Sequence, residues 1–107
     1  MKMFALIQSQ DGYSGKSEGP EIASCDPWLE PASIEVPELL DGQVLVKIAM
    51  ASVNPSDLHF IKGEYGQPRE KGKPAGFEGI GEVVAGNGSY AESLKGTRVS
   101  FVVSKGG

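Results

Sequence analysis

The sequence predicts a small, mainly β domain: a β barrel or sandwich of five or six strands with one short helix. Glycine makes up 15 of the 107 residues, about twice the ~7% share of an average protein, which favours a turn-rich β structure over a helical bundle. Short apolar segments are also separated by glycine and proline, with no alternation of long helices and strands. The length fits one domain over residues 1–107.

The strands are predicted where a short apolar segment is bounded by turn residues. The most apolar segment, residues 43–53 (QVLVKIAMASV), follows an Asp41-Gly42 hairpin signal and is expected to be covered on both faces. Residues 11–20 are polar and glycine-rich, so we expect an exposed loop there. Residues 22–29 remain ambiguous, because nearby prolines argue against a helix. The five predicted strands are residues 4–9, 33–36, 43–53, 79–85 and 97–104.

One short helix is predicted over residues 56–62. Asn54 is suited to cap its N terminus, and Pro55 is suited to its first position, where a missing N–H costs nothing. Gly63 directly follows the segment, and a glycine in the left-handed conformation commonly ends a helix. The prediction therefore places the single histidine of the chain, His59, on this helix.

Composition argues against several classes of partner. The net charge is −4 and no run of four basic residues occurs, so a nucleic-acid partner is not expected. No apolar run reaches the ~18 residues of a membrane span, and polar residues interrupt the apolar start too early for an export signal. Cys25 is the single cysteine and cannot form an intrachain disulfide, so the cytoplasm is the expected compartment.

The residue types do not suit a metal site or a phosphate-binding loop. Structural zinc takes four Cys or His ligands and catalytic zinc takes three, whereas this chain has one Cys and one His. We therefore expect no metal. Residues 76–81 (GFEGIG) are glycine-rich, but a proline-rich segment precedes them and a predicted strand follows, unlike a dinucleotide-binding loop. We interpret these glycines as points of close backbone packing.

Two side chains suit proton transfer, and each also has a simpler interpretation. Histidine has a reference pKa of ~6.5, so this residue type at position 59 suits a proton relay or a substrate contact. It could equally be an ordinary exposed or hydrogen-bonded helix residue. Tyr65 could donate a proton or stabilise an oxyanion, or it could be a half-buried aromatic residue with a solvated hydroxyl. The residues alone leave these alternatives open.

Four motifs in fixed order resemble a known family. They are residues 54–57 (NPSD), 63–66 (GEYG), 74–84 (PAGFEGIGEVV) and 96–99 (GTRV). Together they resemble the GroES-like N-terminal part of the catalytic domain in the medium-chain dehydrogenase/reductase superfamily. The resemblance is strong from residue 42 onward and weaker before it. It implies a GroES-like, partly open β barrel without the Rossmann domain, incomplete at its C terminus.

The resemblance also implies roles for individual residues. In the zinc alcohol dehydrogenase branch, the positions of Asn54 and Phe77 are zinc ligands, so their replacement points to the zinc-free quinone oxidoreductases and enoyl-thioester reductases. By similarity to that branch, Tyr65 faces the substrate and assists proton delivery, and Asn54 lies near the nicotinamide. Ser56 and His59 match a proton relay of alcohol dehydrogenases. We take Tyr65 and His59 as candidate catalytic residues, and Asn54 and Ser56 as candidate cofactor-binding residues.

The resulting expectation is a domain that faces a small quinone or enone substrate in an NADPH-dependent reductase without zinc. NADPH would be bound mainly by a Rossmann domain that this chain lacks, so residues 1–107 alone are expected to be inactive. One alternative is a free-standing β module that binds a partner or forms a homodimer through exposed strand edges. Another is a zinc alcohol dehydrogenase relative with displaced ligands. The residues do not identify the substrate.

Overall fold

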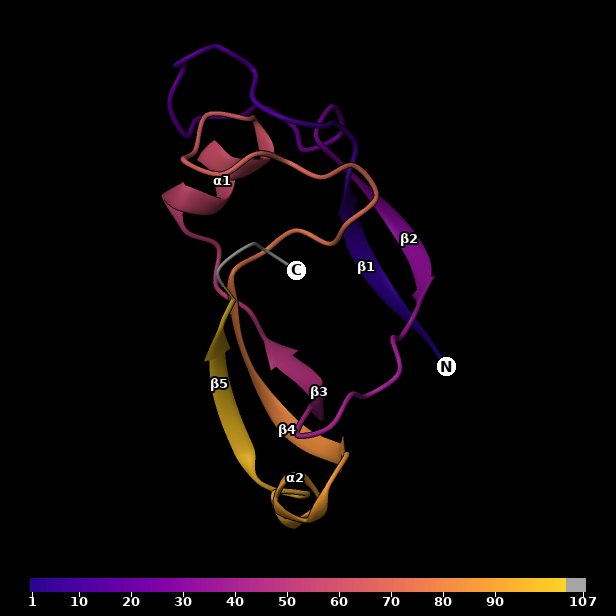
Figure 1. Cartoon of the computed structure of the whole chain (residues 1–107). Helices are drawn as coiled ribbons and strands as arrows, with labels where there is room; N and C mark the ends of the chain where they lie inside the picture. Colours follow the sequence, from indigo (N-terminus) through magenta and orange to yellow (C-terminus); the bar gives the residue numbers. More distant parts are fainter. Residues whose placement is uncertain (104–107) are drawn as a thin grey trace. The chain divides into compact units, whose positions relative to one another are not determined.

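The computed structural model describes residues 1–103 and is mainly β, which confirms the predicted class (Figure 1). These residues form two antiparallel sheets and two short helices. The chain divides into two compact units, which are described separately. Unit 1 comprises Met1–Glu35, Val53–Phe77 and residue 103, and unit 2 comprises Val36–Ser52 and Glu78–Val102. No helix among the described residues is long and apolar enough to cross a membrane.

Unit 1 contains a two-stranded sheet. Strand β1 (Lys2–Gln8) pairs antiparallel with β2 (Leu29–Glu35) over their whole length. The second strand begins four residues before the predicted segment 33–36, so Pro31 lies inside it, opposite Leu6. A proline removes one donor from a ladder, but a strand with a single partner has one side that needs no donor. The strand therefore tolerates the proline and is longer than the predicted segment.

Unit 1 also contains the predicted helix, α1 (Pro55–Ile61), with Asn54 at its N-cap. The helix begins at the predicted proline, and its buried face carries Asp57, Phe60 and Ile61. Phe60 is 1% exposed, so its ring is the centre of the apolar core on this helix. The helix prediction is confirmed to within one residue at each end.

Unit 2 is a three-stranded antiparallel sheet in the order β3-β4-β5. Its strands are β3 (Val44–Met50), β4 (Glu78–Gly86) and β5 (Arg98–Val102). All three predicted segments contain these strands or lie within them, although Ser104 of the last one falls outside the described residues. Val83 of the central strand is 1% exposed and forms the core of this unit with Ala91.

A second short helix, α2 (Ser89–Ser93), was not predicted. Only Ala91 is buried in it, and five residues are too few to show a helical period. It packs directly on the sheet, because a Cβ added at Gly86 would lie 2.5 Å from the carbonyl carbon of Ala91. The glycine at position 86 therefore provides room for this helix.

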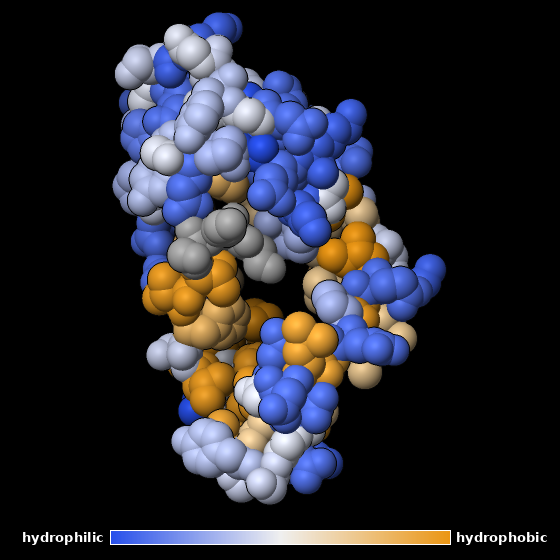
Figure 2. All heavy atoms as spheres, in the orientation of Figure 1, coloured by the Kyte–Doolittle hydropathy of each residue, from blue (hydrophilic) through white to orange (hydrophobic). Residues whose placement is uncertain are grey.

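The expectation that residues 43–53 are covered on both faces is wrong for unit 2. Ile48 is 50% exposed and Met50 is 68% exposed, and none of the residues of β3 is fully buried. Figure 2 shows apolar surface over the part of the molecule where Figure 1 labels β3 and β5. A continuous apolar run is typical of strands with a packed layer over each face, whereas Lys47–Met50 of β3 are all exposed.

Candidate functional site

The four residues singled out from the sequence all lie in one segment of unit 1. Asn54 precedes α1, Ser56 and His59 lie on it, and Tyr65 follows its C-terminal turn. The side chains of Ser56, His59 and Asn54 are half-buried, and Tyr65 is 40% exposed. Within residues 1–103 neither Ser56 nor His59 makes a side-chain hydrogen bond, so the structure describes no relay that links them. The local fold instead orients Asn54 and Tyr65.

Asn54 is held at the start of α1 by the helix itself. The carboxylate Oδ2 of Asp57 accepts a hydrogen bond from the backbone N–H of Asn54 at 2.8 Å. The backbone N–H of Asp57 in turn donates to the carbonyl oxygen of Asn54 at 3.0 Å. Because Asp57 is 9% exposed and lies on the buried face, these bonds connect the candidate cofactor-facing residue to the core of unit 1.

The other end of α1 turns the chain sharply toward Tyr65. Gly63 has φ +78°, and its backbone N–H donates to the carbonyl oxygen of Phe60 at 2.9 Å. The N–H of Glu64 donates to the carbonyl oxygen of His59 at 2.8 Å. These two bonds form a Schellman motif, which requires the left-handed conformation that glycine adopts without strain. The position of Tyr65 is therefore set relative to α1 by its backbone.

The ring of Tyr65 packs on Phe77, which in turn packs on Phe60. The rings of Phe60 and Phe77 meet edge to face, with centroids 5.0 Å apart, and the ring of Tyr65 lies against Phe77 at 5.8 Å. Such contacts contribute about 0.5–1.5 kcal/mol beyond the burial of area. The Tyr65 hydroxyl has no hydrogen-bond partner among residues 1–103. One face of the ring is thus held by packing, while the hydroxyl can serve as a donor to a ligand.

One of the two positions at which the resemblance places zinc ligands does not fit a zinc ion. A phenyl ring at position 77 offers no donor atom, and its ring is engaged with Phe60 and Tyr65. In the part of the chain that the structure describes, no group of three or more His, Cys, Asp or Glu side chains could hold a metal. The aromatic cluster packs around the position where the zinc branch would place an imidazole.

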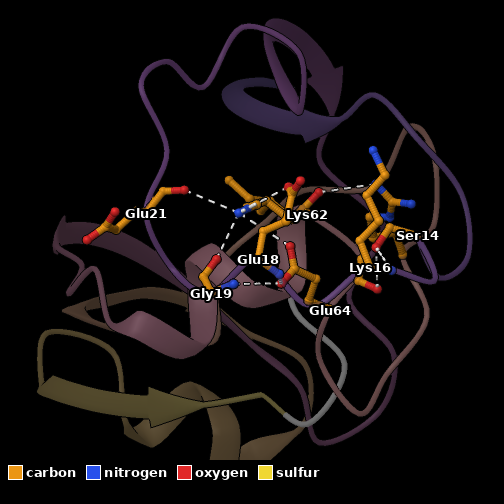
Figure 3. Close-up of polar contacts among 10 residues, drawn as sticks. Ser14, Lys16, Glu18, Gly19, Glu21, Lys62 and Glu64 are labelled. Atoms are coloured by element: carbon orange, nitrogen blue, oxygen red, sulfur yellow. Dashed lines mark hydrogen bonds and ion pairs between the residues drawn. The ribbon is translucent and has the colours of Figure 1, made fainter.

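Sequence reasoning missed a buried ion pair beside Tyr65. Lys62 is 4% exposed, and its Nζ donates to the carbonyl oxygens of Gly19 at 2.8 Å and Glu21 at 3.2 Å (Figure 3). The same nitrogen lies 3.3 Å from a carboxylate oxygen of Glu64, whose side chain is 3% exposed. In the sequence, Lys62 and Glu64 simply flank a glycine. That pattern does not indicate whether their side chains are buried or exposed.

The carboxylate of Glu64 also binds the backbone of the preceding loop. It accepts hydrogen bonds from the N–H groups of Glu18 at 2.6 Å and Gly19 at 2.9 Å. Burial alone would raise the pKa of Glu64, but these two bonds and the ammonium of Lys62 outweigh it, and the pKa lies below its usual value. Glu64 is therefore ionised at neutral pH and acts as an anchor for the loop.

Arg69 is a second buried cation that sequence reasoning missed. It is 5% exposed, and its guanidinium donates to the carbonyl oxygens of Gly12 at 2.8 Å, Asp11 at 3.3 Å and Ile61 at 3.4 Å. Arg69 lies outside the helices and strands named above, and arginine is rarely buried unless its charge is paired. Its three acceptors belong to the N-terminal loop and to α1, so Arg69 ties both to its own segment.

Unit 2 has a cavity of about 580 Å³ at one end of its sheet. Its lining is mainly apolar and includes Met50, Ile80 and Phe101. The Oγ of Ser52 donates to a carboxylate oxygen of Glu78 at 2.5 Å in the same cavity. Both residues have further interactions. We therefore interpret this polar pair as a structural contact at the end of the sheet.

Comparison with known proteins gives consistent relatives. Residues 40–106 match the alcohol dehydrogenase GroES-like domain family. The chain is 38% identical over 63 residues to prostaglandin reductase-3 of Bos taurus, covering 58% of this chain and 17% of that protein. It is 46% identical over 58 residues to the mitochondrial enoyl-[acyl-carrier-protein] reductase of Dictyostelium discoideum, covering 54% of this chain and 16% of that protein.

One solved structure is similar over almost the whole chain. It is a candidate NADPH:quinone reductase from Mesorhizobium loti, 51% identical, with a TM-score of 0.82. The similarity covers 94% of this chain and 30% of that protein. The chain therefore spans less than a third of the solved relative and about a sixth of the curated relatives.

Proposed function

Because the chain belongs to the alcohol dehydrogenase GroES-like domain family, in the quinone and enoyl reductase branch of the medium-chain dehydrogenase/reductase superfamily, we propose that it is the substrate-facing domain of an NADPH-dependent reductase of quinones or enones. The family match confirms the resemblance drawn from the sequence. The observation that carries the finer proposal is Tyr65, whose ring packs on Phe77 while 40% of the residue stays exposed.

The chemistry of the reaction requires a donor of this kind. Addition of a hydride to the β-carbon of an enone moves an electron pair onto the carbonyl oxygen, and a proton must follow. Zinc stabilises such an oxygen in metal-dependent enzymes, but the residue at position 77 does not suit that ion. A hydroxyl aimed at the developing oxyanion supplies the same stabilisation by hydrogen bonding. We assign this role to Tyr65, with His59 as a proton source nearby.

NADPH supplies the hydride when bound. The fold of the described residues does not suit the binding of its diphosphate. All the strand pairs of the described residues are antiparallel, and the glycines of residues 76–81 lead into β4. A dinucleotide fold instead places such glycines between a parallel strand and a helix. We therefore propose that a separate domain holds the cofactor, while Asn54 and Ser56 face its nicotinamide end. Residues 1–107 alone are expected to be inactive.

A chimera tests this proposal directly. Residues 1–107 replace the matching segment of the Mesorhizobium loti protein, which is similar enough in sequence and structure to accept them. Consumption of NADPH is followed by absorbance with 1,4-benzoquinone and with a crotonyl thioester. We expect the chimera to oxidise NADPH with at least one of them, because the domain provides the donor that faces the substrate.

Residues 1–107 alone and the unmodified Mesorhizobium loti protein are the controls. A chimera that folds and binds NADPH, as judged by its fluorescence, but reduces neither substrate contradicts the proposed function. Steady turnover by residues 1–107 alone would contradict the claim that the cofactor is held elsewhere.

Self-association is the second candidate function. Among the described residues β5 pairs only with β4, and Val102 at its end is 76% exposed. An unpaired strand edge with an exposed apolar residue can pair with a second copy. If residues 1–107 form a dimer through this edge, sedimentation velocity should show a dimer that Val102→Lys dissociates. Tyr90→Lys, at a 78% exposed position on α2, is the matched control. A monomer at all concentrations removes this candidate.

A further inference from the structure

We propose that residues 12–19 form a brace that positions Tyr65, and that Glu64 is the positioning residue that anchors it. The functional importance of this brace rests on the proposed function, in which the Tyr65 hydroxyl is the donor. The existence of the brace does not rest on the proposed function, because the brace follows from contacts within unit 1. The family match covers residues 40–106, so residues 12–19 lie outside it.

The brace contacts the chain on both sides of Tyr65. On the N-terminal side, the N–H of Ser14 donates to the carbonyl oxygen of Gly63 at 3.0 Å. On the C-terminal side, the hydroxyl of Tyr13 donates to the carbonyl oxygen of Gly66 at 3.3 Å. Two loop residues thus hold positions two before and one after Tyr65, which limits the backbone movement available to it.

Glu64 completes this arrangement from directly beside Tyr65. Its carboxylate accepts the backbone N–H groups of Glu18 and Gly19 (Figure 3). Hydrogen bonds to an ionised acceptor are about twice as strong as neutral ones, so Glu64 is a strong contact at the C-terminal end of the brace, beside the bond from Lys62 to the carbonyl oxygen of Gly19. Loops held by polar contacts open more readily than packed cores, so the loss of this anchor should loosen the brace at Glu18 and Gly19, and through it the contacts on either side of Tyr65.

Charged groups from several segments of unit 1 line one cavity with Glu64. Lys62 at the end of α1 pairs with it and also lies 3.9 Å from the carboxylate of Glu18. Lys16, Asp11 and Arg69 line the same cavity of about 520 Å³, the first two from the N-terminal loop and the third from the segment after Tyr65. Lys62 is the group in closest contact, so the ionised form of Glu64 is the one that this environment favours.

The protonation of Glu64 should therefore control the brace. Its folded pKa lies below the unfolded value, so the ionised carboxylate contributes stability above the unfolded pKa. That contribution is lost as the pH falls through the lowered folded pKa. A protonated carboxyl accepts backbone N–H groups more weakly. Acidification and removal of the charge by Glu64→Gln should have the same structural effect on Tyr65.

The experiment uses residues 1–107 labelled with 3-fluorotyrosine and ¹⁹F NMR, a readout that does not depend on turnover. The chain has three tyrosines, Tyr13, Tyr65 and Tyr90, and each resonance is assigned by substitution with Phe. In Glu64→Gln we expect the resonances of Tyr13 and Tyr65 to shift or broaden together, while that of Tyr90 on α2 stays in place. Titration of the unmodified chain to acidic pH should reproduce these shifts, and Glu64→Gln should abolish this titration.

Glu92→Gln is the matched control, because Glu92 is exposed and lies on α2 in unit 2. If Glu64→Gln does not fold, Tyr13→Phe removes one brace contact while leaving the anchor, and it should still move the resonance of Tyr65. A Tyr65 resonance that stays in place in both variants overturns the proposal. In the chimera, Glu64→Gln should lower kcat and kcat/KM equally, on the order of 10- to 100-fold, because a misplaced donor weakens transition-state binding.

Discussion

Replacing Tyr65 by phenylalanine in the chimera is expected to lower kcat on the order of 100-fold, the usual effect of removing one oxyanion donor. Phenylalanine keeps the ring, so the contact with Phe77 at 5.8 Å is retained. The hydroxyl that is lost has no hydrogen-bond partner among residues 1–103, so its removal leaves no group there unpaired. The free energy of unfolding should therefore stay within about 0.5 kcal/mol of that of the unmodified protein.

The variant is therefore expected to lose turnover without losing stability. Steady-state kinetics with a quinone and with an enone measure kcat and KM, and thermal unfolding measures stability in the same preparation. Tyr90→Phe removes the hydroxyl of a residue that is 78% exposed on α2, and it should change neither quantity. If Tyr65→Phe retains full turnover, then Tyr65 is not the donor, even though the family assignment would stand.

Gly63→Ala is expected to cost at least about 2 kcal/mol of stability, because two effects add. A non-glycine residue at φ +78° carries about 1–2 kcal/mol of strain. The added Cβ would also lie 2.7 Å from both Cζ of Arg69 and the backbone nitrogen of Ser14. Neither neighbour can move easily, since Arg69 donates to three carbonyl oxygens. Urea unfolding of residues 1–107 measures this loss, which is large against the ~5–15 kcal/mol of a typical domain.

Substitutions at two other glycines separate the cost of backbone strain from the cost of the close contacts at Gly63. Gly72 has φ +86°, but a Cβ there would meet no atom within 4 Å, so Gly72→Ala reports the backbone strain alone. Gly66 has neither a positive φ nor a close neighbour, so Gly66→Ala should be nearly neutral. Should Gly63→Ala cost no more than Gly72→Ala, the close packing of Arg69 and Ser14 against Gly63 would not contribute to stability.

Local signals in the sequence predicted the elements well where a few neighbouring residues decide the conformation. Asn54, Pro55 and Gly63 define the two ends of α1, because caps, proline and left-handed glycine act within one turn. The strands β4 and β5 followed from short apolar segments between turns. The replacement of both zinc-ligand positions was also readable, since it depends only on which residues stand at 54 and 77.

Contacts between distant residues could not be read in this way. Lys62 and Arg69 are buried because carbonyl groups from residues 11–21 surround them, and these partners lie more than forty positions away in the sequence. The same limit explains β3, whose apolar run suggested two covered faces, because which segments pack over a strand is not encoded locally, and Met50 is 68% exposed.

The sequence by itself determined the mainly β class, the position of α1 and the family, because propensities, caps and motifs are local properties of the chain. Only the tertiary structure decided how Tyr65 is held. Its ring lies against Phe77, and its backbone is bracketed by a loop that begins some fifty residues earlier. The physical reason is that burial and ion pairing depend on which distant segments meet, and a buried charge such as that of Glu64 is stabilised only by partners that folding brings to it.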